Sequence, residues 1–235
     1  MMTLHAALSQ TFPVGDLPAA VRTALGYPLR RVSPLAQLAV LGVRAALPAA
    51  WADRPGVLLW QSRSGPRDET LALLADLAAG EAPMPYDFLM TQPALAAAAL
   101  PQLLPGLQAV HHVPLADEAA SQWGLLLPLA LHWLAEGRYA YALCAQLDVW
   151  GDQASGHWLC LAPALASDQA DMLGIRLHLN TASTCPTLTE GLGGGLDDAA
   201  NLPEQILHWR NSSLAPAMTL KCPVAYRQTV EFQKN

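Results

Sequence analysis

The feature that most constrains this chain is an apolar helix expected at residues 119–135. Every residue from 124 to 135 is apolar except His132, and a helix that is apolar all round must be buried on several sides. The apolar run is too short to cross a bilayer, which takes about 20 residues. Strands are expected before and after it, at residues 108–115 and 139–147. The helix therefore predicts a right-handed crossover between parallel strands, placed at the centre of the fold.

The rest of the chain alternates between helix and strand signals. Ser33 is a typical N-cap, and Pro34 suits the first turn of the helix that follows. Helices are expected at residues 34–47, 68–79, 93–104, 164–173 and 203–210, and strands at 56–60, 156–161 and 175–179. Two prolines between residues 83 and 90 argue against a regular helix there. We predict an α/β architecture with a mostly parallel sheet, a buried central helix and covering helices.

Charge and hydropathy exclude several classes of function. The net charge is −6, and only two of the residues are lysines, Lys221 and Lys234. No basic stripe is available to neutralise a phosphate backbone, so nucleic acid binding is not expected. We expect no transmembrane span, and the first residues lack the basic start and apolar run of a signal peptide. A cytoplasmic location is the default expectation.

The chain offers no recognisable site for a metal or a cofactor. Its cysteines are widely separated and form no C-x-x-C pair, which predicts buried, reduced thiols and no metal site. The four positions are Cys144, Cys160, Cys185 and Cys222. The glycine-rich run at residues 191–195 lacks the preceding strand and the following Lys-Ser/Thr of a phosphate cradle, so we expect a linker there and no cofactor.

Six local strings occur in a meaningful order along the chain. They are RR followed by PLAQLAV from residue 30, RPGVLLW from 54, MPYDF running into ALAAA from 84, AEGRYAYALCA from 135, GHWLCL from 156 and ADMLGIRL from 170. In this order they resemble the N-terminal half of the β-ketoacyl synthases, which have the thiolase fold. The resemblance implies a ketosynthase-like domain at residues 1–180. Residues 181–235 would form an irregular C-terminal extension that packs on it.

The departures from this family bear on function. Active members carry a nucleophilic cysteine at the start of the buried helix, a position that falls near Ala120 here. No cysteine precedes Cys144. About 55 residues follow residue 180, too few for the second half of the fold, which supplies the family's two catalytic histidines. Inactive relatives often have glutamine at the nucleophile position. Gln122 lies two residues away and would point elsewhere.

The resemblance therefore implies a non-catalytic subunit, with no catalytic residue of its own. Such subunits include the chain-length factors of type II polyketide and aryl-polyene systems. The expected partner is an active β-ketoacyl-acyl-carrier-protein synthase of fatty acid, polyketide or aryl-polyene biosynthesis, and acyl carrier protein would be contacted only indirectly.

Two segments are the expected sites of contact with that partner. In the family, the segment resembling Tyr86, Phe88, Met90 and Gln92 reaches across the dimer and lines the partner's acyl cavity, although ordinary packing of loop aromatics is an equal alternative. The strand that holds His111 and His112 pairs with its counterpart across the dimer axis. Adjacent strand residues face opposite sides, so the two imidazoles cannot act together on one substrate, and a structural role is favoured.

Two other functions remain open at this point. Ser121, with Asp117 and a remote His157 or His208, could form the triad of a small acyl hydrolase or thioesterase, although no serine of the chain lies in a G-x-S-x-G elbow. A homodimeric scaffold is the other alternative, because half of a pseudo-symmetric fold leaves apolar surface uncovered.

Overall fold

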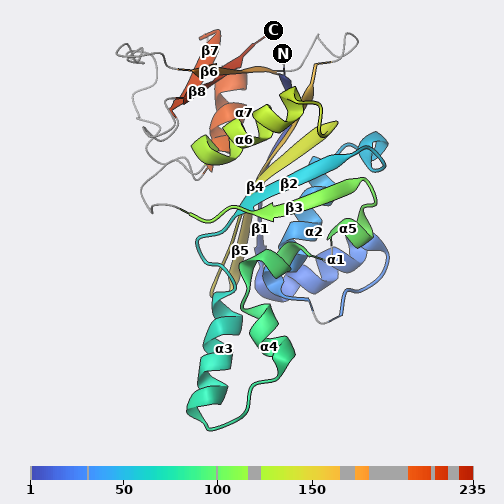
Figure 1. The fold of residues 1–235 in the computed structure, drawn as a ribbon, viewed down its shortest axis with the longest axis vertical. Coiled ribbons are helices and arrows are strands. Elements are labelled where there is room, and N and C mark those ends of the chain that lie inside the picture. Colours follow the sequence, from blue (N-terminus) through green and yellow to red (C-terminus); the bar gives the residue numbers. More distant parts are fainter. Residues whose placement is uncertain are drawn as a thin grey trace.

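The computed structural model describes residues 2–30, 32–98, 100–115, 123–164, 173–179, 201–212, 215–221 and 228–234 (Figure 1). The strands are β1 (Met2–Pro13), β2 (Gly56–Gln61), β3 (Leu107–His112), β4 (Tyr141–Trp150), β5 (Gln153–Pro163), β6 (Leu173–Leu179), β7 (Ala217–Lys221) and β8 (Gln228–Gln233). The α-helices are α1 (Leu17–Leu25), α2 (Pro34–Ala46), α3 (Arg67–Ala78), α4 (Pro85–Met90), α5 (Leu100–Leu103), α6 (Trp123–Ala135) and α7 (Leu202–Ser212). Short 3-10 turns are η1 (Val14–Asp16), η2 (Ala49–Trp51) and η3 (Pro93–Ala97).

The described strands form one sheet in the order β3-β2-β4-β5-β1-β6-β8-β7. The expectation of a mostly parallel sheet was wrong. Only β2 is paired in parallel, with β3 and β4, whereas the other pairings among the described strands are antiparallel. β4 and β5 are antiparallel because a tight turn at Gly151, with φ of 57°, joins them as a hairpin. The long strand β1, which sequence analysis did not assign, adds a further antiparallel pairing.

Helix α6 lies at the centre of the fold, as its apolar sequence predicted. It packs on β2, β4, β5 and β8. Figure 1 shows α6 and α7 between the strands β3-β2-β4 and the smaller β6-β8-β7 part of the sheet. Helices α1, α2 and α5 cover the opposite face of the larger part, so the sheet separates two apolar cores.

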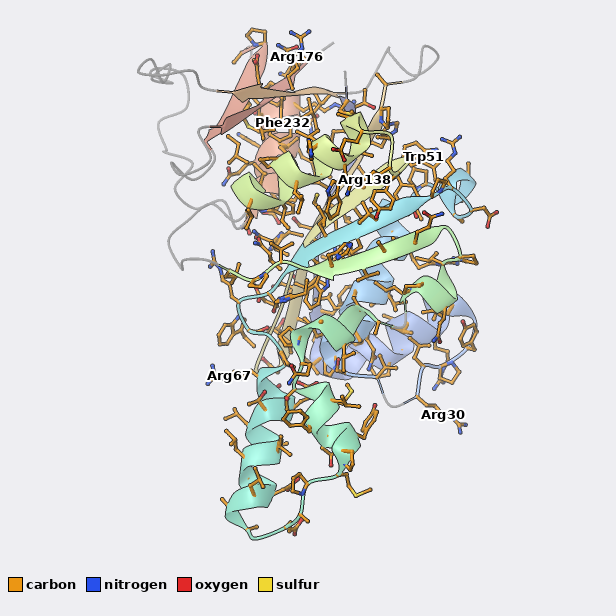
Figure 2. The ribbon with its side chains drawn as sticks, viewed as in Figure 1. Arg30, Trp51, Arg67, Arg138, Arg176 and Phe232 are labelled. Carbon is orange, nitrogen blue, oxygen red and sulfur yellow. The ribbon has the colours of Figure 1, made fainter. Side chains whose placement is uncertain are left out.

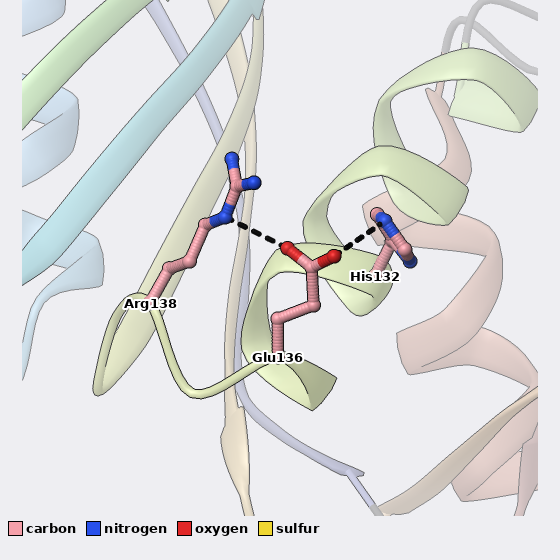
Figure 3. A network of polar contacts seen from close by, with 3 residues as sticks. All are labelled: His132, Glu136 and Arg138. Atoms are coloured by element: carbon pink, nitrogen blue, oxygen red, sulfur yellow. Dashed lines mark ion pairs between the residues drawn. The ribbon is translucent and has the colours of Figure 1, made fainter.

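The start of α2 and the end of α6, which the sequence predicted, have clear physical causes. Ser33 caps α2, since its Oγ accepts a hydrogen bond of 3.2 Å from the Ala36 N–H. After α6 the chain turns at Gly137, which has a φ of 71°. Glu136 braces that turn (Figure 3): its carboxylate lies 3.0 Å from His132 Nε2 and 2.7 Å from Arg138 Nε.

Three further expectations need correction. Residues 85–90 do form a helix, α4, because Pro85 occupies its first turn, where no N–H donor is needed. The helix expected at residues 93–104 is broken into η3 and α5. The C-terminal extension, expected to be irregular, forms α7, β7 and β8 in its described residues.

The C-terminal elements continue the fold of the rest of the chain. β8 pairs with β6, and α7 packs against β1 and β5. On β6, Leu173 and Ile175 are buried, whereas Arg176 is exposed. The helix expected at residues 164–173 lies almost wholly outside the described residues, and Leu173 begins β6.

Candidate partner interface

Helices α3 and α4 form a hairpin that projects from the body of the molecule (Figure 1). Helix α3 packs chiefly against α4. Of its leucines only Leu73 is buried, whereas Leu71, Leu74 and Leu77 keep 49–55% of their surface exposed. A helix this apolar is normally covered on one face, and exposed apolar patches of this kind mark interaction sites. The α3–α4 hairpin therefore has the character of a binding surface.

Helix α4 adds a second set of exposed apolar side chains to the hairpin. Met84, Tyr86, Phe88 and Leu89 are 46–65% exposed. The apolar surface thus extends over both helices of the hairpin.

The four residues singled out from the sequence lie on one continuous segment. Tyr86 and Phe88 are exposed on α4, Met90 at its end is half-buried, and Gln92 is exposed just before η3. Sequence reasoning missed Leu71, Leu74 and Leu77 of α3. These leucines recur at helical spacing, which does not distinguish a face that meets the core from one that stays open.

The base of the hairpin is held by the carboxylate of Asp148 on β4. Asp148 Oδ1 accepts hydrogen bonds from Arg63 N at 2.6 Å, Ser64 N at 2.8 Å and Ser62 Oγ at 3.2 Å. Ser62 Oγ in turn accepts from Gly65 N at 2.8 Å. Gly65 has a φ of 54°, which a residue with a side chain rarely adopts. This network fixes the turn that leads from β2 into α3.

A second contact links the hairpin to the body. The Arg67 guanidinium lies 5.2 Å from the centre of the Trp150 ring, at the end of β4. Figure 2 shows Arg67 at the junction between hairpin and body. A cation over an aromatic face at this distance is attractive. Polar contacts and this cation–π pair therefore position the hairpin, while its apolar side chains stay outside the core.

Strand β3 forms one end of the sheet and pairs, within the described residues, only with β2. Its two histidines face opposite sides, as predicted. His111 packs on Trp133 of α6, with ring centres 5.3 Å apart, and His112 packs on Trp60 at 4.7 Å. Burial lowers the pKa of His112. No other described strand pairs with the outer edge of β3, and an unpaired edge of this kind can accept another strand.

The comparisons with known proteins bear on this geometry. No protein-family model and no curated protein matches the chain. Among solved structures, a chain of the ketosynthase (ApeO) in complex with its chain length factor (ApeC) from Xenorhabdus doucetiae is similar to it, with a TM-score of 0.54 and 15% identity. The match covers 98% of this chain and 99% of that chain. The ishigamide ketosynthase/chain length factor matches at a TM-score of 0.50 and 13% identity, over 77% and 68% of the two chains.

The chain has a ketosynthase-like thiolase fold. At these identities the likeness is one of fold alone. After residue 180, the described residues form α7, β7 and β8 of this fold.

The described thiols of the ketosynthase-like fold are unsuited to nucleophilic chemistry. Cys144 on β4 and Cys160 on β5 are fully buried. Burial raises the pKa of Cys160 to about 12 and that of Cys144 also far above its usual range. A protonated thiol is a poor nucleophile. The nucleophile-equivalent position near Ala120, and Gln122 beside it, lie outside the described residues.

Of the alternative hydrolase triad, the structure describes only the two candidate histidines. Ser121 and Asp117 lie outside the described residues. His157 on β5 shares a hydrogen bond of 2.9 Å, through Nδ1, with Ser9 Oγ on β1, and His208 is exposed on α7. Burial lowers the pKa of His157, although Glu204 and Asp148 act to raise it. Ser9 lies within a regular strand and not at a strand-to-helix elbow.

Two classes of site are not found in the described part of the chain. No group of three or more His, Cys, Asp or Glu side chains there could hold a metal ion. None of the described helices has both the length and the apolar character that a membrane span requires.

Proposed function

We propose that this chain is a non-catalytic ketosynthase-like subunit, of the chain-length-factor type, that pairs with an active β-ketoacyl-acyl-carrier-protein synthase. The observation that carries the proposal is the α3–α4 hairpin, whose leucines and aromatic side chains are exposed on a positioned projection. Exposure of such apolar side chains to water is unfavourable, and burying them on a partner removes this free-energy cost. The similarity over nearly the whole length of both chains to a chain of a ketosynthase–chain length factor complex adds support.

The buried thiols support a non-catalytic role for the chain itself. No cysteine precedes Cys144 in the sequence, and Cys144 and Cys160 are both held protonated in the core. Acyl transfer by a ketosynthase needs an accessible thiolate. In the proposed complex the partner supplies that thiolate and also binds acyl carrier protein, so this chain meets the carrier only indirectly.

The role that we propose for the hairpin is to shape the partner's acyl cavity. Tyr86 and Phe88 would bury their rings on the partner, with Met90 and Gln92 beside them, and the size of these side chains would limit the length of the growing acyl chain. The open edge of β3, with His111 and His112, would lie at the subunit interface. Residues 1–180 would act as the ketosynthase-like domain and residues 181–235 as its extension, in a cytoplasmic fatty acid, polyketide or aryl-polyene pathway.

Co-expression with the synthase encoded nearest to this chain tests the proposal. We expect the two proteins to elute together from size-exclusion chromatography, and Leu74→Asp to separate them. Leu207→Asp is the matched control, since Leu207 is an exposed leucine on α7, away from the hairpin. We also expect Phe88→Ala to shift the product distribution to longer chains. Two proteins that elute separately, with product lengths unchanged when this chain is removed, would contradict the proposal.

A further inference from the structure

Beyond Arg67, the first residue of α3, the hairpin carries no positive charge. Between Arg67 and Arg138 the sequence contains no lysine or arginine, although the whole chain has 13. The same stretch carries eight carboxylates, and five of them belong to the hairpin: Asp68, Glu69, Asp76, Glu81 and Asp87. Beyond Arg67, every charged side chain of the hairpin is therefore a carboxylate.

These carboxylates are placed among the exposed leucines. Asp68 and Glu81 are exposed, and Glu69, Asp76 and Asp87 are half-buried. Arg67 lies at the junction with the body, where its guanidinium packs on Trp150, and Arg138 and Arg176 lie away from the hairpin (Figure 2). Among the described residues, no ion pair joins a carboxylate of the hairpin to a lysine or arginine.

We infer that the hairpin docks into a groove of the synthase subunit that has an apolar floor and a rim of lysine and arginine side chains. This inference rests on the proposed function and adds the chemistry of the partner's surface. Leucines and aromatic rings need an apolar floor, and carboxylates that enter an interface unpaired are strongly unfavourable. Opposite charge on the rim pairs them and speeds encounter.

The same charge pattern disfavours the other possible occupants. A second copy of this chain would bring two acidic hairpins together, and like charges across an interface suppress association. An anionic membrane surface attracts basic segments, whereas this hairpin has none beyond its base. The synthase subunit with a basic rim is therefore the occupant to which the observations point.

Charge reversal within the full chain tests the inference. The variant Asp76→Lys/Glu81→Lys/Asp87→Lys changes three carboxylates of the hairpin. The control Asp16→Lys/Asp53→Lys/Asp152→Lys changes the net charge equally at exposed positions elsewhere. Binding to the purified synthase is followed by biolayer interferometry at low and high salt. Circular dichroism checks that each variant is folded.

We expect the association rate of the wild type to fall about tenfold or more from low to high salt, because steering by opposite charges is screened. The hairpin variant should associate about tenfold more slowly than the wild type at low salt, and the control variant at close to the wild-type rate. If the wild type binds equally fast at both salt concentrations and the hairpin variant binds as fast as the wild type, the inference is overturned and the proposed function still stands. No binding at any salt concentration would instead count against the proposed function.

The other occupants are tested on the chain alone. Light scattering that shows a homodimer, dispersed by Leu74→Asp, would overturn the inference. Leu74-dependent binding to vesicles of phosphatidylcholine and phosphatidylserine would also overturn it. A chain that is monomeric and does not bind such vesicles agrees with the inference.

Discussion

Gly42 of α2 lies directly against the indole of Trp158 of β5, with no room between them for a methyl group. A Cβ on Gly42 would lie 1.9 Å from Trp158 Cε2, and the indole is fully buried. Real contacts between carbon atoms are optimal at about 3.5–4.0 Å. The glycine therefore sets how closely α2 covers the sheet and the core beneath it.

Gly42→Ala is expected to destabilise the protein by about 1–3 kcal/mol, because the indole and its neighbours must move in a packed core. The usual gain of about 1 kcal/mol from replacing a helical glycine by alanine offsets part of the cost. Urea unfolding measures the difference. Gly15→Ala is the matched control, since a Cβ there meets no atom within 4 Å. A Gly42→Ala protein as stable as the wild type would show that the contact is looser than described.

Much of the fold could be predicted from local patterns in the sequence. The Ser33 cap and the apolar period of the next residues located α2 closely, and the short apolar run at residues 56–60 located β2. Pairing partners could not be predicted in the same way, because they are set by contacts far apart in sequence. The strand β1 was missed, since most of its side chains are only half-buried and show no clear alternation.

The candidate interface could be predicted only in part. The resemblance to ketosynthases singled out Tyr86 and Phe88 as candidates, and both side chains are exposed. The leucines of α3 were not recognised as part of it. An apolar helix has the same sequence pattern whether its face meets the core or a partner, so only the arrangement in space distinguishes the two.

Asp148→Ala is expected to loosen the hairpin. It removes the acceptor of three hydrogen bonds from Ser62, Arg63 and Ser64, and leaving partly buried donors unpaired costs about 1–3 kcal/mol. Limited proteolysis should cut residues 62–92 faster than in the wild type. Asp148→Asn keeps a neutral acceptor. Its cleavage rate should lie between those of Asp148→Ala and the wild type, because hydrogen bonds to a charged acceptor are stronger. Equal cleavage rates for Asp148→Ala and the wild type would contradict this account of the hairpin base.

Cys144 and Cys160 are expected to resist alkylation in the folded protein. Burial raises both pKa values well above the usual thiol value, and neither side chain is accessible. Iodoacetamide at about pH 8.5, near the ordinary thiol pKa, should leave both unmodified when peptides are analysed by mass spectrometry. The same treatment in guanidinium chloride is the control and should modify both. Rapid modification of either residue in the native chain would count against the non-catalytic role.

His157 is expected to make the folded protein less stable in mild acid. Burial lowers its folded-state pKa below the ordinary value of 6.5, although Glu204 and Asp148 partly oppose this. The unfolded chain therefore takes up a proton at a higher pH than the folded chain does. The free energy of unfolding should be constant well above pH 6.5, fall as the pH drops below 6.5, and level off below the folded pKa.

Urea unfolding across this pH range measures the effect, and His157→Gln isolates it. Glutamine can still hydrogen-bond to Ser9 Oγ but does not titrate, so the variant should lose less stability on acidification than the wild type. Some pH dependence should remain, because burial also lowers the pKa of His112. His208→Gln, at an exposed position on α7, should keep the wild-type slope. If His157→Gln and the wild type lose stability equally between pH 6.5 and the acid plateau, then His157 is hydrated in the folded protein and the packing described around it is wrong.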